Sequence, residues 1–255
     1  MKGEATNSKD IVIKIDNLRK NFGSLEVLKD ISVKLYKGEN LVVLGKSGTG
    51  KSVLIKCIVR LLDADAGKII VLDEEINSMK SKELDNIRGK IGFLFQSGAL
   101  YDSMTVRENL AFPLKRIKKD LSAEEVDAKI LKTLEDVGLP NVIDKMPSEL
   151  SGGMRKRISL ARTVIVDPSI MLYDEPTTGL DPVTSDEISF LINDIQKKYK
   201  TSSIIITHDI ECAKTVANRI IMLHEGKVYM EGTLSDFEKS KDELVQSFFK
   251  SKNQH

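Results

Sequence analysis

The pattern of apolar and polar residues predicts a series of short strands. Apolar and charged residues alternate at 11–15 and at 31–35, as they do in strands with one exposed face. Residues 41–44 form an uninterrupted apolar run, which is typical of a strand covered on both faces. Further strands are expected at residues 69–72, 91–95, 170–173, 203–207, 220–223 and 227–230.

Helical periodicity appears in the middle and later parts of the chain. Ser122 and Glu125 form a predicted capping box, and Gly138 would end the helix that they begin. One face of this helix would carry Val126, Ile130, Leu134 and Val137. Thr184 and Glu187 would cap another helix, which would carry Ile188, Leu191, Ile192 and Ile195. Other helices are expected at residues 52–62, 152–166 and 209–217.

Buried strands that alternate with helices imply an α/β fold with a mostly parallel sheet and right-handed crossovers. The helical block at 97–166 interrupts this alternation and would be a subdomain inserted between two core strands. The main domain would span 11–233, after a polar and flexible N-terminus at 1–10. The charged segment at 234–255 is expected to be a loosely held, solvated helical tail.

Composition limits the class of protein. The chain has 255 residues, 41% hydrophobic and 30% charged, which suits one large α/β domain with an inserted subdomain. A formal net charge of +1 gives no sign of a nucleic-acid partner. No apolar run reaches the about 20 residues that cross a bilayer, so a soluble or peripheral protein is expected. Cys57 and Cys212 lack metal-ligand spacing and are expected to be reduced core thiols.

A complete P-loop pattern lies between the strand expected at 41–44 and a predicted helix. Its glycines allow a tight turn that points successive backbone N–H groups at phosphate oxygens, and the N-terminus of the following helix favours negative charge. Lys51 would reach the β- and γ-phosphates, and the Ser52 hydroxyl would ligate Mg²⁺. The predicted nucleotide-binding residues are Gly45, Lys46, Ser47, Gly48, Thr49, Gly50, Lys51 and Ser52.

Two acids, Asp174 and Glu175, stand at the end of the buried strand expected at 170–173. The carboxyl ends of strands are where open α/β sheets bind ligands. Asp174 would hold Mg²⁺ through its water shell, and Glu175 would polarise the water that attacks the γ-phosphate. With the P-loop, these acids predict ATP and Mg²⁺ as cofactors and ATP hydrolysis as the reaction.

A second glycine motif, Leu150-Ser151-Gly152-Gly153-Met154, precedes the helix expected at 152–166. Its exposed amides, its hydroxyl and the positive helix end also suit a phosphate group. Taken alone, this motif would indicate a simple helix cap. Together with the P-loop and the two acids, it favours a phosphate-binding role over a simple cap.

The motifs stand in the order found in the ATP-binding cassette (ABC) family, which the chain resembles over residues 11–230. To them the resemblance adds Gln96 and His208 at strand ends, Phe22, and Gly179-Leu180-Asp181 after the acids. It implies a P-loop ATPase fold: a RecA-like, mostly parallel core, an N-terminal antiparallel β subdomain and an inserted helical subdomain.

The resemblance also implies how the residues would work. ABC ATPase domains pair head to tail, so ATP would lie between the P-loop of one copy and the motif at 150–154 of a second copy. Gln96 would contact Mg²⁺ or the attacking water and couple the site to a membrane partner. His208 would hold the γ-phosphate, and Phe22 would stack on the adenine.

Two stretches, residues 95–114 and 146–154, resemble a narrower group. They are similar to the ATPase subunits of the lipid-asymmetry (Mla-type) transporters, which work with lipid-binding Mce-domain proteins. Met154, where most ABC members have Gln, is shared with that group. The resemblance implies a homodimeric ATPase that drives a multi-pass permease for phospholipids, on the cytoplasmic face of the inner membrane, together with an Mce-domain protein.

Other functions stay open at this point. The permease partner could import another solute, such as an amino acid or a metal. Non-transport ABC ATPases of translation or DNA repair usually carry two cassettes or a long coiled coil, and this chain has one P-loop and a near-neutral charge. A regulatory module without turnover would not need Glu175 and His208. The sequence does not indicate the cargo, the transport direction or the role of the tail.

Overall fold

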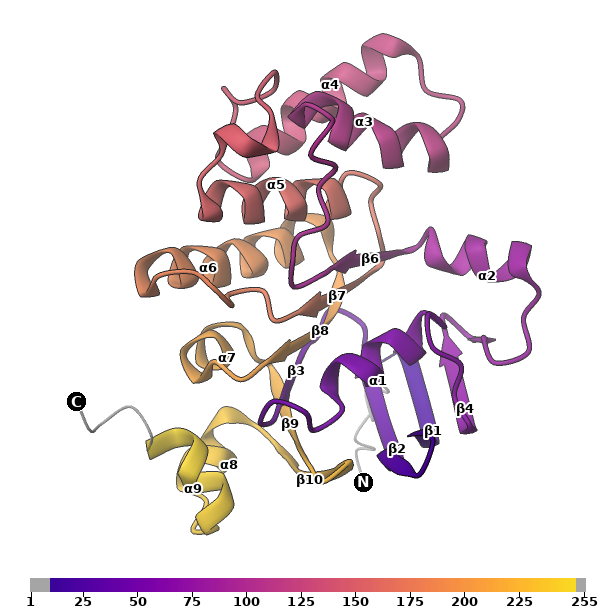
Figure 1. The fold of residues 1–255 in the computed structure, drawn as a ribbon, viewed down its shortest axis with the longest axis vertical. Coiled ribbons are helices and arrows are strands. Elements are labelled where there is room, and N and C mark those ends of the chain that lie inside the picture. The colour runs from indigo at the N-terminus through magenta and orange to yellow at the C-terminus, as the bar shows by residue number, and fades with distance from the viewer. Residues whose placement is uncertain (1–9, 251–255) are drawn as a thin grey trace, which may run out of the picture.

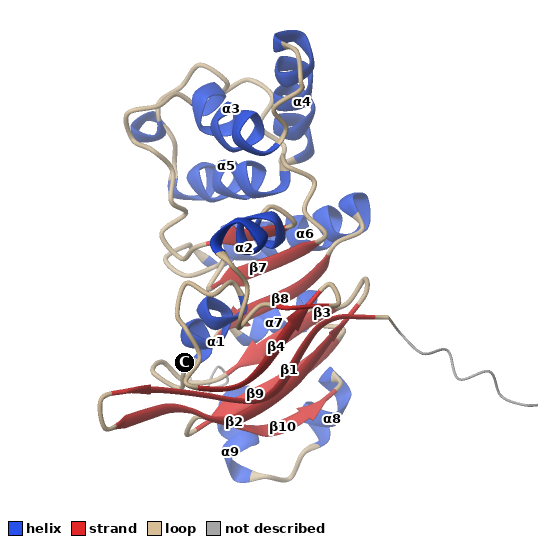
Figure 2. Cartoon of the chain, turned by 90° about the vertical axis from the view of Figure 1, so that its right-hand side faces the viewer, coloured by secondary structure: helices blue, strands red, loops and turns tan. Residues whose placement is uncertain are grey.

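The computed structural model describes residues 10–250, which fold around two β-sheets (Figures 1 and 2). The flexible N-terminus predicted at 1–10 lies, except for Asp10, outside the described residues. The smaller sheet has the order β2-β1-β4-β5, and its paired strands are antiparallel, as predicted. Its strands are β1 (Ile11–Phe22), β2 (Leu25–Tyr36), β4 (Ala66–Val71) and β5 (Glu74–Glu75).

The larger sheet is mostly parallel, also as predicted, with the order β10-β9-β3-β8-β7-β6. β10 runs antiparallel to β9, and the other neighbours pair in parallel. Its strands are β3 (Asn40–Leu44), β6 (Ile91–Leu94), β7 (Ile170–Asp174), β8 (Ser202–Thr207), β9 (Arg219–His224) and β10 (Lys227–Gly232). Because these parallel strands share one direction, the loops after β3, β7 and β8 meet at one edge of the sheet.

Helices pack around the larger sheet and extend beyond it at one end of the molecule (Figure 1). They are α1 (Lys51–Ile58), α2 (Ser81–Arg88), α3 (Val106–Ile117), α4 (Ala123–Asp136), α5 (Gly152–Val164), α6 (Pro182–Tyr199), α7 (Ile210–Val216), α8 (Leu234–Lys239) and α9 (Glu243–Lys250), with a 3₁₀ turn at Pro147–Glu149. Although β6 and β7 are neighbours in the sheet, α3, α4 and α5 come between them in the chain. Among residues 10–250, none of the helices combines the length and the apolar character that crossing a bilayer requires.

Alternate side chains of the central strands enter two apolar cores. In β3, Val42 and Leu44 belong to a core shared with α3 to α7, whereas Leu41 and Val43 belong to one shared with α1 and the smaller sheet. Every residue of β3 is buried, as expected of a parallel strand covered on both faces. Cys57 and Cys212 are buried, free thiols, which confirms their prediction as core residues.

Two helix ends differ from the prediction by more than two residues. α1 ends at Ile58 instead of residue 62, because Arg60 has a positive φ of 51° and breaks the helical backbone. Thr184 and Glu187 do not cap α6. Its N-cap is Asp181, whose carboxylate accepts a hydrogen bond from the Thr184 N–H at 3.0 Å. The predicted capping box at Ser122 and Glu125 is confirmed.

The C-terminal tail differs most from the prediction. Within the described residues it forms two helices, α8 and α9, instead of one loosely held, solvated helix. Phe237 and Val245 are 1% and 0% exposed and join the core that α5, α6 and α7 also line. The prediction failed because the many charged residues of this segment made its few apolar residues hard to recognise as core residues. The apolar contacts of Phe237 and Val245 hold the tail on the domain.

Candidate functional site

The P-loop joins β3 to α1 and owes its shape to its glycines. Gly48 and Gly50 have φ values of +82° and +96°, which disfavour residues that carry a Cβ. A Cβ on Gly45 would lie 2.7 Å from Thr49 Oγ1 and 2.8 Å from the Leu223 carbonyl oxygen, so glycine is required there. The loop is a compact turn that leads into the N-terminus of α1, and this is the arrangement that binds phosphate.

Lys51 lies beneath this loop and is 5% exposed. Its Nζ donates to the carbonyl oxygens of Gly45 at 2.7 Å and Lys46 at 3.1 Å, and lies 3.6 Å from Glu175 Oε1. Burial lowers the pKa of Lys51, while the charges of Glu175 and Asp174 act to raise it. The ammonium group is therefore a buried donor held between the loop and the acids.

Ser52 and Asp174 meet across the site. Ser52 Oγ donates to Asp174 Oδ1 at 2.8 Å, and Asp174 is 5% exposed. Neighbouring ligand oxygens of an octahedral Mg²⁺ lie about 2.9 Å apart, given Mg–O distances of 2.0–2.1 Å. The spacing and the oxygen chemistry of this pair therefore fit Mg²⁺, with Asp174 bound directly or through the water shell of the ion.

Glu175 follows directly after β7 and is 9% exposed. Its φ is +50°, a conformation that costs about 1–3 kcal/mol for a residue other than glycine and is common at functional sites. Its N–H donates to the Ile206 carbonyl oxygen at 2.9 Å, which fixes the turn to β8. Glu175 Oε2 lies 2.8 Å from His208 Nδ1 and accepts a bond from Thr178 Oγ1 at 3.3 Å. The carboxylate is thus oriented from several sides.

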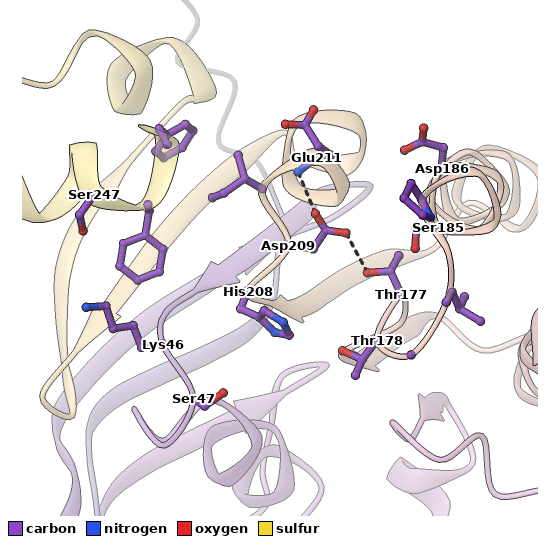
Figure 3. Close-up of a pocket in the computed structure, with 16 residues that line it drawn as sticks. Lys46, Ser47, Thr177, Thr178, Ser185, Asp186, His208, Asp209, Glu211 and Ser247 are labelled. Atoms are coloured by element: carbon purple, nitrogen blue, oxygen red, sulfur yellow. Dashed lines mark hydrogen bonds between the residues drawn. The ribbon is translucent and has the colours of Figure 1, made fainter. Parts of the chain in front are cut away.

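A cavity of about 710 Å³ opens beside this cluster (Figure 3). Lys46 and Ser47 of the P-loop line it together with His208, Thr178 and residues of α9. The side chain of His208 is 52% exposed and stands between the P-loop residues and Thr178 in this view. The structure therefore brings the P-loop, both acids and His208 into one site.

The second glycine motif lies elsewhere. Ser151 is the N-cap of α5, and its Oγ accepts a bond from the Met154 N–H at 3.2 Å. Gly152 lines a different cavity, of about 440 Å³, with Gln96 and Leu180. Ser151, Gly152 and Gly153 are all absent from the lining of the cavity beside His208. Within one copy, the two phosphate-seeking helix ends therefore do not line one cavity.

Gln96 and Phe22 lie at the ends of two other strands, β6 and β1. Gln96 follows β6, is exposed, and accepts a bond from Lys156 Nζ on its backbone oxygen at 2.8 Å. Phe22 ends β1 and is 47% exposed, with Lys20 Nζ 5.5 Å from the centre of its ring. Neither residue lines the cavity beside His208.

Sequence reasoning missed several polar residues near the acids. Besides Thr178, these are Thr177, whose Oγ1 donates to Asp209 Oδ2 at 3.2 Å, and Asp209, which caps α7. Asp209 directly follows His208, and Thr177 and Thr178 lie between Glu175 and Gly179, in loops at the carboxyl ends of β8 and β7. The sequence signal that could have identified them is a polar residue close to a predicted site residue, in a loop at the carboxyl end of a parallel strand.

A phosphate-binding loop after β3, and paired acids after a nearby parallel strand, define a P-loop nucleoside triphosphatase. A family model described as "ABC transporter" matches residues 28–178, and the chain belongs to this family. It is the ATP-binding and ATP-hydrolysing subunit of an ABC transporter.

Curated relatives cover nearly all of the chain. It is 37% identical over 259 residues to "Protein TRIGALACTOSYLDIACYLGLYCEROL 3, chloroplastic" of Arabidopsis thaliana, a match that spans 95% of this chain and 74% of that protein. It is 39% identical over 246 residues to "Probable ribonucleotide transport ATP-binding protein mkl" of Mycobacterium leprae, spanning 96% and 71% of the two chains.

Solved cassettes share the fold. The dimeric structure of MJ0796, a bacterial ABC transporter cassette, superposes with a TM-score of 0.81 at 31% identity, covering 87% of this chain and 98% of that one. A post-hydrolysis state of the same cassette, bound to ADP and Pi, gives a TM-score of 0.79 at 32% identity over the same shares of the two chains. These matches confirm the predicted P-loop ATPase fold with its antiparallel and helical parts.

Proposed function

We propose that the chain hydrolyses ATP as a homodimer, with each nucleotide held between the P-loop of one copy and the motif at 150–154 of the other. The observation that carries this proposal is that Lys46 and Ser47 of the P-loop line one cavity of the copy, whereas Gly152 of the second motif lines another, which adjoins the first at residues 178–180. Each copy offers two helix ends suited to phosphate but one Asp-Glu pair after β7. The solved cassette MJ0796 is dimeric, which is consistent with this arrangement.

In this dimer Lys51 and the loop amides bind the β- and γ-phosphates. Ser52 and Asp174 hold Mg²⁺, which when bound neutralises charge on the transferred phosphoryl group. Glu175 orients and polarises the attacking water, and its hydrogen bonds keep its carboxylate aligned for that task. His208, half exposed beside Glu175, holds the γ-phosphate.

Two further residues act at the edges of this site. Phe22 presents an exposed ring that stacks on the adenine. Gln96 reaches the Mg²⁺ or the attacking water once the two copies close. It also starts the segment that would contact the membrane partner, so it links hydrolysis to transport.

Glu175→Gln tests the chemical part of the proposal. The amide keeps the shape of the side chain but polarises water less, so kcat should fall by roughly 100- to 1,000-fold while ATP binding is kept. The control is Glu211→Gln, an exposed carboxylate on α7 that lines the same cavity, which should leave kcat within about twofold. Near-normal hydrolysis by Glu175→Gln would contradict the role given to this residue.

The cargo that the sequence favours is a phospholipid. Residues 95–114 resemble lipid-asymmetry ATPases, and one relative bears the name of a galactolipid, trigalactosyldiacylglycerol. In this stretch Tyr101 and Phe112 are 42% and 39% exposed and pack edge to face with ring centres 5.3 Å apart. An exposed aromatic pair suits contact with another protein. The partners would be a multi-pass permease and an Mce-domain protein, on the cytoplasmic face of the inner membrane.

Co-purification from membranes tests the cargo. A multi-pass permease together with an Mce-domain protein would support lipid transport. Other relatives are named for ribonucleotide transport and for methionine import, so the purified complex should be assayed with phospholipid, ribonucleotide and methionine. ATP hydrolysis that responds to methionine or a ribonucleotide, and not to phospholipid, would refute the lipid cargo and leave the ATPase role intact.

A further inference from the structure

Lys156 is a buried cation that the proposed mechanism does not use. It lies on α5, five residues after Ser151, and is 6% exposed. Its Nζ donates to the Gln96 backbone oxygen at 2.8 Å, across a sequence separation of 60 residues. A lysine is rarely buried to this degree without a defined task.

A second contact on the same face of α5 holds the turn that contains Gln96 (residues 95–98). The Gly98 N–H closes this turn by donating to the Phe95 carbonyl oxygen at 2.9 Å. A Cβ on Gly98 would lie 2.6 Å from Ser159 Oγ, so the turn packs directly on the helix. Ser159 stands three residues after Lys156 and therefore on the same helix face. The turn is thus fastened to α5 at two points.

The charge of Lys156 belongs to the active site as well. Burial lowers its pKa, while Asp174 and then Glu175 act to raise it. Within residues 10–250, no carboxylate oxygen lies within ion-pair distance of Lys156 Nζ, so its influence on the two acids is exerted over a longer range. The hydrogen bond from its Nζ is directed at the turn.

We propose that Lys156 is a positioning residue that couples the two faces of each copy. α5 begins with Ser151, Gly152 and Gly153, about 6 Å along the helix axis from Lys156 at 1.5 Å per residue. When those residues grip the nucleotide of the second copy, α5 moves as a rigid body and carries Gln96 with it through Lys156. This inference rests on the proposed dimer and on the role proposed for Gln96.

The test is a double-mutant cycle of Lys156→Met and Gln96→Ala in the full chain, with its membrane partner where activity requires it. Lys156→Met should lower kcat about tenfold, leave half-saturation by ATP within about twofold, and add no further loss to Gln96→Ala. Lys156→Arg, which keeps the cation and its donors, should restore most of kcat. Lys132→Met, an exposed lysine on α4, is the matched control and should have no effect.

Three results would overturn the inference. The first is a loss of kcat that multiplies with that of Gln96→Ala, since Lys156 would then act independently of the turn. The second is a loss of ATP binding by Lys156→Met that equals its loss of kcat, because such a result indicates general damage to the fold. The third is an inert Gln96→Ala, which refutes the role proposed for Gln96 itself and the inference with it. Lys156→Leu, which likewise removes the donor, carries the same test if Lys156→Met does not fold.

Discussion

Replacing Gly153 with alanine tests the packing of α5 against α6. The new Cβ would lie 2.6 Å from Thr184 Cγ2, closer than the 3.0 Å that Cβ contacts essentially never breach. Thr184 cannot rotate away freely, because its Oγ1 donates to Asp181 Oδ2 at 2.5 Å and its branched Cβ is stiff. An extra methyl group in a packed contact costs about 1–3 kcal/mol, and the helical preference of Ala over Gly returns up to about 1 kcal/mol. Gly153→Ala should therefore lose about 1–2 kcal/mol of stability.

Thr184→Ser supplies the matched rescue. It removes the clashing methyl group and keeps the hydroxyl that bonds to Asp181, and the remaining Thr184 atoms lie 3.9 Å from the new Cβ. Thermal denaturation of the wild type, both single variants and the double variant should give a favourable coupling of about 1–2 kcal/mol, or roughly 2–8 °C in Tm for a chain of this size. Strictly additive effects would refute the clash as the cause. ATPase activity that stays low in the restabilised double variant would show that the phosphate contact itself requires glycine.

Other predictions follow from the tail, the thiols and Lys51. Phe237→Ala should destabilise the protein by about 3 kcal/mol, whereas replacing Phe190, which is 60% exposed on α6, with alanine should cost less than about 0.5 kcal/mol. Equal urea unfolding midpoints for the two variants would contradict a docked tail. Burial raises the pKa of Cys57 to about 11 and of Cys212 to about 12, so iodoacetamide at about pH 8 should label them only after unfolding; labelling of the native protein would count against this. Burial lowers the pKa of Lys51 below its ordinary 10.5, so the unfolded chain binds more protons in the window below 10.5. The unfolding free energy of the wild type, relative to Lys51→Met, should then rise as the pH approaches 10.5 from below, and a fall would reverse the reasoning.

The buried strands were predictable because a parallel strand covered on both faces is a continuous apolar run. The run at 41–44 corresponds to β3 at Asn40–Leu44 within one residue. The first strand was expected at 11–15 but extends to Phe22. Its second half was missed because its open face carries polar residues and its backbone turns at Asn17, with a φ of +51°. α2 was missed because two residues, Leu84 and Ile87, make up its buried face. Short amphipathic elements leave little periodic signal.

The site was predictable where its residues are neighbours in sequence. The P-loop and the pair Asp174-Glu175 are local patterns, and the geometry of strand ends explains why each needs its particular residues. Contacts between distant segments are of another kind. The bond between Glu175 and His208 spans 33 residues, and the one from Lys156 to Gln96 spans 60. They exist because β6, β7 and β8 are adjacent in the sheet, which no local pattern specifies.

The balance of buried charge gives a physical reason for the two copies to close on the nucleotide. Within one copy, the buried charges near the P-loop already compensate each other, Lys51 and Lys156 against Asp174 and Glu175. Mg-ATP brings further negative charge, and buried charge without compensation is costly. In the proposed dimer the positive end of α5 from the second copy supplies part of this compensation, equivalent to about half an elementary charge. Nucleotide binding and dimer closure should therefore strengthen each other by the same factor. When the γ-phosphate leaves, the negative charge that attracts the positive end of α5 decreases. Hydrolysis itself would therefore weaken the contact between the two copies and allow them to open.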